Sequence, residues 1–300
     1  MPQTISTAFY DAIFEQPSSN EQMNELEQQT LANIREVLDS PEELSKLIPP
    51  LSNITLQLIE ALKDEEADFV MFAEIIEKDP SLAINIMKVA NSAKYARGND
   101  KVQSIRQAVN VLGKSGLATI ATTELVKQIM PHQPIYFKMF GKHIWEHSQQ
   151  CATLAQIIAS YWELDEFDAH FLGLIHDVGK IVIFNALCSA FKQAALDDSP
   201  GSLSFKTLMS EMSVDMSYFI AKEWQLPEQY SAALLEQRTK RTSKLGDLLY
   251  RSNLITEVYL LQQKGRIKPE KMLEILDQVK IDNAIWQAFI ETVQDQKVLC

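Results

Sequence analysis

Apolar residues recur every three or four positions along most of the chain, the spacing that places them on one face of an α-helix. Such stripes run through residues 20–46, 51–130, 140–164 and 203–296. No segment alternates convincingly between apolar and polar residues over the length of a strand. The pattern therefore predicts an all-α protein.

Local signals place some of the helix ends. Asp79-Pro80-Ser81 predicts a helix start, since an Asp can cap a helix and Pro at the first position loses no hydrogen bond. The β-branched run 181–187 would suit a strand, but it has no partner strand and continues into an Ala-rich pattern, so we predict a helix. Residues 132–137 (HQPIYF) read as a linker, and 199–202 as a loop.

Composition narrows the class of protein. Only nine glycines occur among 300 residues, and 46% of the chain is hydrophobic, enough for a packed core that we expect to form two lobes. The net charge of −12 argues against a broad nucleic-acid interface. Three widely spaced cysteines, no signal peptide and no uninterrupted apolar run of about 20 residues predict a cytoplasmic protein that does not span a membrane.

The stretch GLIHDVGK places His176 and Asp177 side by side in an apolar segment, and no histidine follows it. A neutral imidazole and a carboxylate can share one divalent metal ion. His147 lies on the apolar stripe of its predicted helix and is the best further ligand, although a histidine there is more often a core residue. His143 lies at the edge of that stripe and we expect it to be exposed; His132 is a further candidate. His170 is about 240° around the helix from His176, so the two cannot face one ion.

Two charged residues complete the candidates. Asp247 stands among apolar residues in LGDLLY. It could be a metal ligand, or it could be an ordinary aspartate that caps a helix or pairs with a nearby Arg or Lys. Lys180 could contact a phosphate, or could be a surface residue that complements a helix end. No nucleophile motif or phosphate-binding glycine loop is present, so an enzyme of this sequence would be a metal-dependent hydrolase whose ion activates water.

These residues resemble the HD superfamily, whose minimal pattern is a histidine, a His-Asp doublet and a distant aspartate. The resemblance implies a metal site of His147, His176, Asp177 and Asp247. The stretches LIPPLSNITLQLIEAL, EIIEKDPSLAINIMKVANSAKY, SIRQAVNVLGKSGLATI and EWQLPEQYSAAL are similar to the HDOD family of bacterial signalling proteins. The likeness, from about Leu47 to Tyr250, implies an N-terminal lobe at 47–131 and an HD-like lobe at 132–250. Residues 1–46 would be a helical extension, and 251–300 C-terminal helices.

The sequence departs from the cyclic-dinucleotide phosphodiesterases of this superfamily. It has no Gly-Tyr-Pro motif, and Val214, Gln237 and Arg238 stand where those enzymes have additional histidines. Valine cannot ligate a metal and arginine repels one, so a multinuclear site is disfavoured, while one divalent ion remains compatible.

The resemblance implies a regulatory module without catalysis, which binds a signalling protein or a small nucleotide-like ligand. The alternative is a mononuclear phosphohydrolase acting on a nucleotide or phosphate ester, in which Lys180 would steady the leaving phosphate. The sequence leaves the oligomeric state open.

Overall fold

The computed structural model describes residues 2–19, 22–40, 42, 53–64, 66–92, 95, 101–129, 135–191 and 201–298. Within these ranges every regular element is a helix, which confirms the all-α prediction, and a single isolated β-bridge joins Ser19 to Ser202. The helix predicted over 181–187 is present as part of a longer one. His132 and parts of the predicted linker and loop lie outside the described residues.

The helices have the following bounds. They are α1 (Pro2–Ile13), α2 (Glu25–Asp39), α4 (Asn53–Lys63), α5 (Phe69–Ile76), α6 (Pro80–Ala90), α7 (Ile105–Ile129), α8 (Ile135–Tyr161), α9 (Glu166–Ile175), α10 (Val178–Phe191), α11 (Leu203–Glu223), α12 (Glu228–Leu235), α13 (Lys244–Gln263), α14 (Pro269–Gln278) and α15 (Asn283–Val298).

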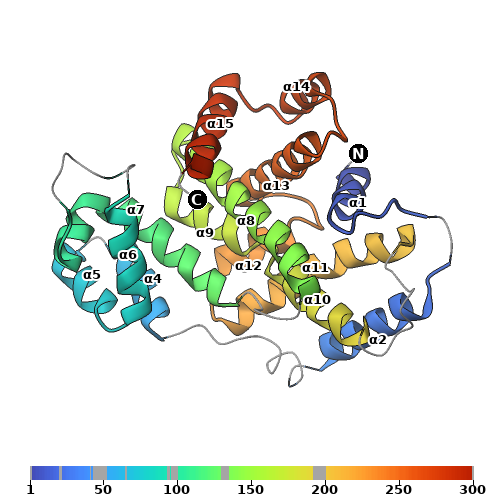
Figure 1. The fold of residues 1–300 in the computed structure, drawn as a ribbon, viewed down its shortest axis with the longest axis horizontal. Coiled ribbons are helices and arrows are strands. Elements are labelled where there is room, and N and C mark those ends of the chain that lie inside the picture. Colours follow the sequence, from blue (N-terminus) through green and yellow to red (C-terminus); the bar gives the residue numbers. More distant parts are fainter. Residues whose placement is uncertain are drawn as a thin grey trace.

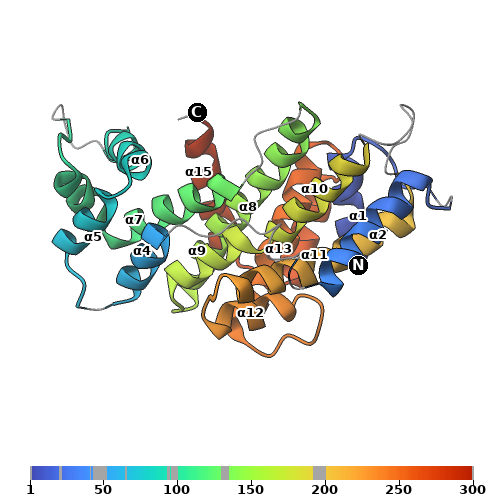
Figure 2. The ribbon, with the colours of Figure 1, turned by 90° about the horizontal axis from the view of Figure 1, so that it is seen from below.

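The smaller lobe consists of α4, α5, α6 and the first half of α7, and it lies at one end of the molecule (Figures 1 and 2). Its core is a separate apolar cluster built around Phe72, Ile76, Ile86 and Val109. The predicted start of α6 is confirmed, because the Asp79 side chain accepts hydrogen bonds from the first turn and Pro80 occupies its first position. α7 extends from this lobe to α9 of the larger one.

The larger lobe packs α8 to α13 around one apolar core, and α1, α2, α14 and α15 contribute to the same core. Phe9 of α1 and Leu26 of α2 are almost fully buried in it. The residues at both ends of the chain are therefore part of the larger lobe. The predicted boundary at residue 250 falls inside α13, a single continuous helix.

The junction between α9 and α10 positions the His-Asp doublet. α9 ends at Ile175 with His176 as its C-cap, and α10 begins at Val178. Gly173 lies so close to α8 that an added Cβ would stand 2.7 Å from the Ala152 Cα, and one at Gly179 would stand 2.2 Å from the Ser213 carbonyl oxygen of α11. The stretch Glu166–Leu187 is apolar and long enough to cross a membrane, but 89% of its apolar window is buried inside the protein. Its apolar character is thus explained by core packing.

We expect Gly179→Ala to destabilise the fold by about 1–3 kcal/mol, because the new methyl group can be accommodated only if α10 and α11 move apart. Chemical denaturation of both proteins measures the difference. Ser204→Ala, at an exposed position of α11, should stay within about 0.5 kcal/mol of the wild type. Equal stability of the Gly179→Ala variant and the wild type would contradict this account of the junction.

Candidate functional site

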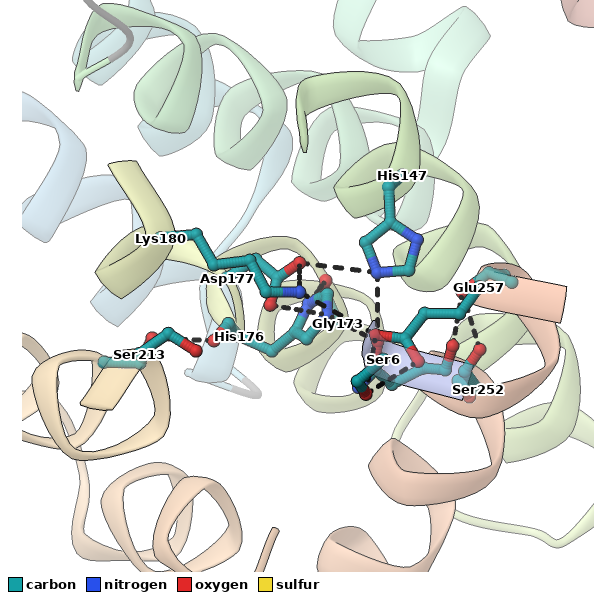
Figure 3. Close-up of polar contacts among 12 residues, drawn as sticks. Ser6, His147, Gly173, His176, Asp177, Lys180, Ser213, Ser252 and Glu257 are labelled. Atoms are coloured by element: carbon teal, nitrogen blue, oxygen red, sulfur yellow. Dashed lines mark hydrogen bonds and ion pairs between the residues drawn. The ribbon is translucent and has the colours of Figure 1, made fainter. Parts of the chain in front are cut away.

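Two segments of the larger lobe bring His147, His176 and Asp177 together, as the sequence predicted. The His147 Nε2 lies 3.4 Å from one Asp177 carboxylate oxygen, and the His176 Nε2 lies 3.2 Å from the other. One ligand atom from each residue lies within 4.8 Å of the others, and all three side chains are buried. Figure 3 shows His147 extending from α8 toward the doublet. These atoms form the candidate metal site.

The fourth member of the cluster is Asn253 of α13, whose side-chain oxygen lies 3.0 Å from the His147 Nε2 and 3.1 Å from the His176 Nε2. Asp247 is not in the cluster. Its carboxylate pairs with Arg251 at 2.7 Å, and its side chain is 36% exposed. Asp247 precedes Asn253 on the same helix by about 240° of rotation, so it faces another direction. The prediction of Asp247 as the fourth member is therefore wrong. The neutral side-chain amide of Asn253 occupies that place.

The hydrogen bonds of the two imidazoles assign different roles to their Nε2 atoms. His176 donates from Nδ1 to the Gly173 carbonyl at 2.7 Å, so in the neutral ring its Nε2 carries a lone pair. That lone pair faces oxygens of Asp177 and Asn253, an arrangement that suits a cation. The His147 Nδ1 has no hydrogen-bond partner among the described residues, so a proton on Nε2, donated to Asn253, satisfies that ring.

Lys180 brings a positive charge into the cluster. Its buried ammonium donates to Asp177 at 2.7 Å and lies 3.9 Å from a Glu257 oxygen of α13. The ammonium also lies 4.7 Å from the centre of the Phe9 ring and 5.8 Å from that of Tyr10, within range of cation–π attraction. Of the two alternatives for Lys180, the surface residue is therefore wrong, because the side chain is 6% exposed and faces the site.

Burial and charge together set the protonation states. Burial lowers the pKa of His147 to about 3, against the opposing effect of Asp177, so the ring is neutral at pH 7. Burial alone would raise the pKa of Asp177, but His176 and Lys180 overcome it and lower that pKa to about 2. Burial opposes the charge of Lys180, yet Asp177 raises the lysine pKa above its usual value. Burial also lowers the pKa of His176, so at pH 7 the core of the site is a carboxylate–ammonium pair between two neutral imidazoles.

Helix α1 covers the site. Ser6 donates a hydrogen bond of 3.1 Å to Glu257 (Figure 3). The centre of the Phe9 ring lies 4.8 Å from that of His147. No motif in the sequence indicated this cover. The spacing of Asn253 and Glu257, one turn apart on an apolar helix, was the available signal for two buried polar groups on one face.

The donor set is compatible with one divalent ion, since two imidazoles, a carboxylate and an amide oxygen converge within hydrogen-bonding distances. The net charge around these donors is less favourable for a divalent ion. The Lys180 ammonium already neutralises the single carboxylate among these donors, so the positive charge of an ion would meet no net negative charge from them.

The remaining sequence candidates add no ligand. The His143 Nδ1 lies 3.7 Å from Glu146, and its side chain is 22% exposed. His170 is buried but does not belong to the cluster, as its spacing predicted. The Gln237 amide donates to carbonyls of Ala233 and Gly246. The Arg238 guanidinium pairs with Asp215, while Val214 lies on α11.

Comparison with protein families assigns this fold. The HDOD domain family matches residues 48–239, almost two thirds of the sequence. The chain belongs to the HDOD domain family. Among curated proteins, none matches it. The family match ends before Asn253 and begins after α1, so two of the parts that shape the candidate site lie outside it.

Solved structures with the same fold are distant in sequence. A candidate metal-dependent phosphohydrolase from Shewanella amazonensis SB2B is 18% identical, with a TM-score of 0.60, covering 89% of this chain and 97% of its own. An HDOD domain protein of unknown function from Geobacter sulfurreducens is 20% identical, with a TM-score of 0.58 and coverages of 87% and 88%. A candidate signal transduction protein from Marinobacter aquaeolei VT8 is 17% identical, with a TM-score of 0.58, covering 100% of this chain and 65% of its own. At these identities the likeness concerns the fold alone.

Glu257 gives the site a measurable pH dependence. Burial raises its pKa from 4.5 to about 7, although Lys180 opposes the shift. A raised carboxyl pKa stabilises the folded protein fully below pH 4.5, and this contribution is lost as pH rises to about 7. We expect Glu257→Gln to remove this loss, making the variant more stable than the wild type at pH 8 by up to about 3 kcal/mol and nearly equal at pH 5.

Urea denaturation at the two pH values measures the effect. The exposed Glu270→Gln on α14 provides the control, with no pH-dependent difference expected. A Glu257→Gln variant that is destabilised equally at both pH values would contradict the raised pKa.

Proposed function

We propose that this HDOD protein is a regulatory module of a bacterial signalling system and that it acts by binding rather than by catalysis. The observation that carries the proposal is the pairing of the buried Lys180 ammonium with Asp177, beside a neutral Asn253. An internal cation and an amide stand where a metal-dependent hydrolase would need uncompensated carboxylates.

Two further features support the proposal. The His147 Nδ1 has no hydrogen-bond partner among the described residues, whereas a metal-ligating imidazole ordinarily donates from its second nitrogen. Phe9 of α1 packs against that ring, and Ser6 bonds Glu257, so among the described residues the candidate ligands are buried beneath α1, which disfavours access by a phosphate ester. The ionic cluster then serves to hold α1, α8, α10 and α13 in place.

The second candidate function is a mononuclear phosphohydrolase, and one observation favours it. The lone pair of the His176 Nε2 faces two oxygens, from Asp177 and Asn253, an arrangement that a cation would stabilise. His147 would complete the ligand set, and the ion would lower the pKa of a bound water. Lys180, engaged by Asp177, would have to move before it could steady a leaving phosphate.

Metal content separates these functions. We expect the wild type, incubated with Mn²⁺ and dialysed, to retain far less than one ion per chain by elemental analysis. Asn253→Asp supplies the second carboxylate and should raise retention toward one ion per chain. Asn283→Asp, an exposed site on α15, is the matched control and should behave as the wild type.

Turnover gives the second readout. The wild type should hydrolyse neither nucleotides, cyclic dinucleotides nor a generic phosphate ester above the rate of a His176→Ala variant. One tightly bound ion in the wild type, together with turnover that His176→Ala abolishes, would establish the phosphohydrolase instead.

The partner of this module is proposed to be a signalling protein or a small ligand in the cytoplasm. The acidic net charge of −12 supports a partner other than nucleic acid. The buried state of the apolar Glu166–Leu187 stretch supports a protein that does not enter a membrane.

A further inference from the structure

An open groove with acidic walls lies between α4 and α5 of the smaller lobe. Its volume is about 480 Å³, and the candidate metal ligands take no part in it. The charged residues of its described walls are Glu60, Asp64, Glu74 and Lys78, which supply three carboxylates and one ammonium. Neither the Glu60 nor the Glu74 carboxylate forms an ion pair with another described residue. The described walls of this acidic groove therefore attract a cation.

Apolar surface lies beside these carboxylates. Ala61 and Ile75 line the groove and are almost fully buried, whereas Met71 lines it and is 43% exposed. Phe69 and Val70, which precede Met71, are 47% and 42% exposed. A lysine side chain combines an apolar stem with a charged end, so it matches such walls better than a small free cation does.

A cationic loop lies on the larger lobe, between α12 and α13. Its four basic residues are all exposed, in a chain whose net charge is −12, and they are Arg238, Lys240, Arg241 and Lys244. Arg238 pairs with Asp215, and the Arg241 guanidinium lies 3.8 Å from the centre of the Tyr250 ring. Lys240 and Lys244 pair with no carboxylate in the part of the chain that the structure describes. Two ammonium groups of the cationic loop are therefore available to a partner.

Glu236 holds the cationic loop in one shape. Its carboxylate accepts hydrogen bonds from the Thr242 hydroxyl at 2.6 Å, the Ser243 hydroxyl at 2.8 Å and the Ser243 N–H at 3.1 Å. The Ser243 oxygen also caps α13, because it accepts a hydrogen bond from the Gly246 N–H. A loop that is already ordered loses less conformational freedom when it binds.

We propose that the cationic loop of one copy of this chain docks in the acidic groove of a second copy, with Lys240 and Lys244 beside Glu60 and Glu74. The opposite charges of the two surfaces support this occupant. Figure 2 shows the segment between α12 and α13 apart from α4 and α5, on the other lobe. The contact is therefore head-to-tail, and each pair of copies retains one free groove and one free loop, so association can continue.

The net charge of −12 opposes association at long range, whereas the groove and the loop act at contact. At 0.1 M salt the Debye length is about 10 Å, so the long-range repulsion is largely screened while close pairs still attract. Association of this kind would make a signalling module respond to its own concentration.

Sedimentation velocity of the full chain at increasing concentration tests the proposal. In 0.1 M NaCl the average mass should rise above the 34.1 kDa of one chain, with a dissociation constant below about 1 mM. In 1 M NaCl, where the Debye length falls to about 3 Å, association should weaken at least tenfold. Association through apolar surface alone would not weaken in this way.

Two double variants test the two halves of the contact. Lys240→Gln with Lys244→Gln neutralises the loop, and Glu60→Gln with Glu74→Gln neutralises the groove. Each variant alone should associate at least tenfold more weakly than the wild type. An equimolar mixture should regain the wild-type affinity but stop at a dimer, because one variant keeps an intact groove and the other an intact loop.

Matched controls change the same charges at other exposed positions. They are Glu270→Gln with Glu291→Gln, and Lys142→Gln with Lys268→Gln, and both should associate as the wild type does. Circular dichroism checks that every variant keeps its helices.

Three results would overturn the proposal. They are a single-chain mass at all concentrations, as expected if another protein occupies the groove; association that salt does not weaken; or a mixture of the two double variants that associates no better than either alone. Metal content and turnover do not enter this test, so its failure is distinguishable from that of the proposed function.

Discussion

The contact between the Lys180 ammonium and the Asp177 carboxylate is the interaction on which the interior of the larger lobe depends. Both groups are buried, and each would be costly alone. Together they face α8 through His147, α13 through Glu257 and α1 through the Phe9 ring. The ion pair therefore has neighbours on three further helices and constrains how they pack against α10. The same neutralisation makes the cluster a poor host for a second cation.

Much of the fold was predictable from local sequence. Helical periodicity, few glycines and the Asp79-Pro80 start each described a local property, and the structure agrees with them. The helix over 181–187 was predicted from the lack of a partner strand, although β-branched residues argued otherwise. What local sequence did not provide was the assignment of the chain ends. α1 joins the core of the larger lobe through contacts with residues more than a hundred positions away, and periodicity carries no such information.

The site, like the fold, was predictable where local sequence carried the information. His147, His176 and Asp177 were identified because a doublet and an apolar stripe constrain direction as well as residue type. Asp247 was selected by its residue type within an apolar frame, and the direction of α13 at that point was unknown. The inward face of α13 is set by its packing against α8 and α1. It presents Asn253 and Glu257, and only the tertiary structure identifies that face.

The cover formed by α1 bears on how members of the HDOD family can be compared with one another. The matched domain, residues 48–239, supplies the histidines, the aspartate and the lysine, whereas Ser6, Phe9 and Asn253 come from outside it. Two proteins could share the whole domain and still differ in whether the candidate site is covered and in which charges it contains. Function in this architecture is therefore divided between the domain and its flanking segments. A classification made from the domain alone would group together molecules whose sites are chemically unlike.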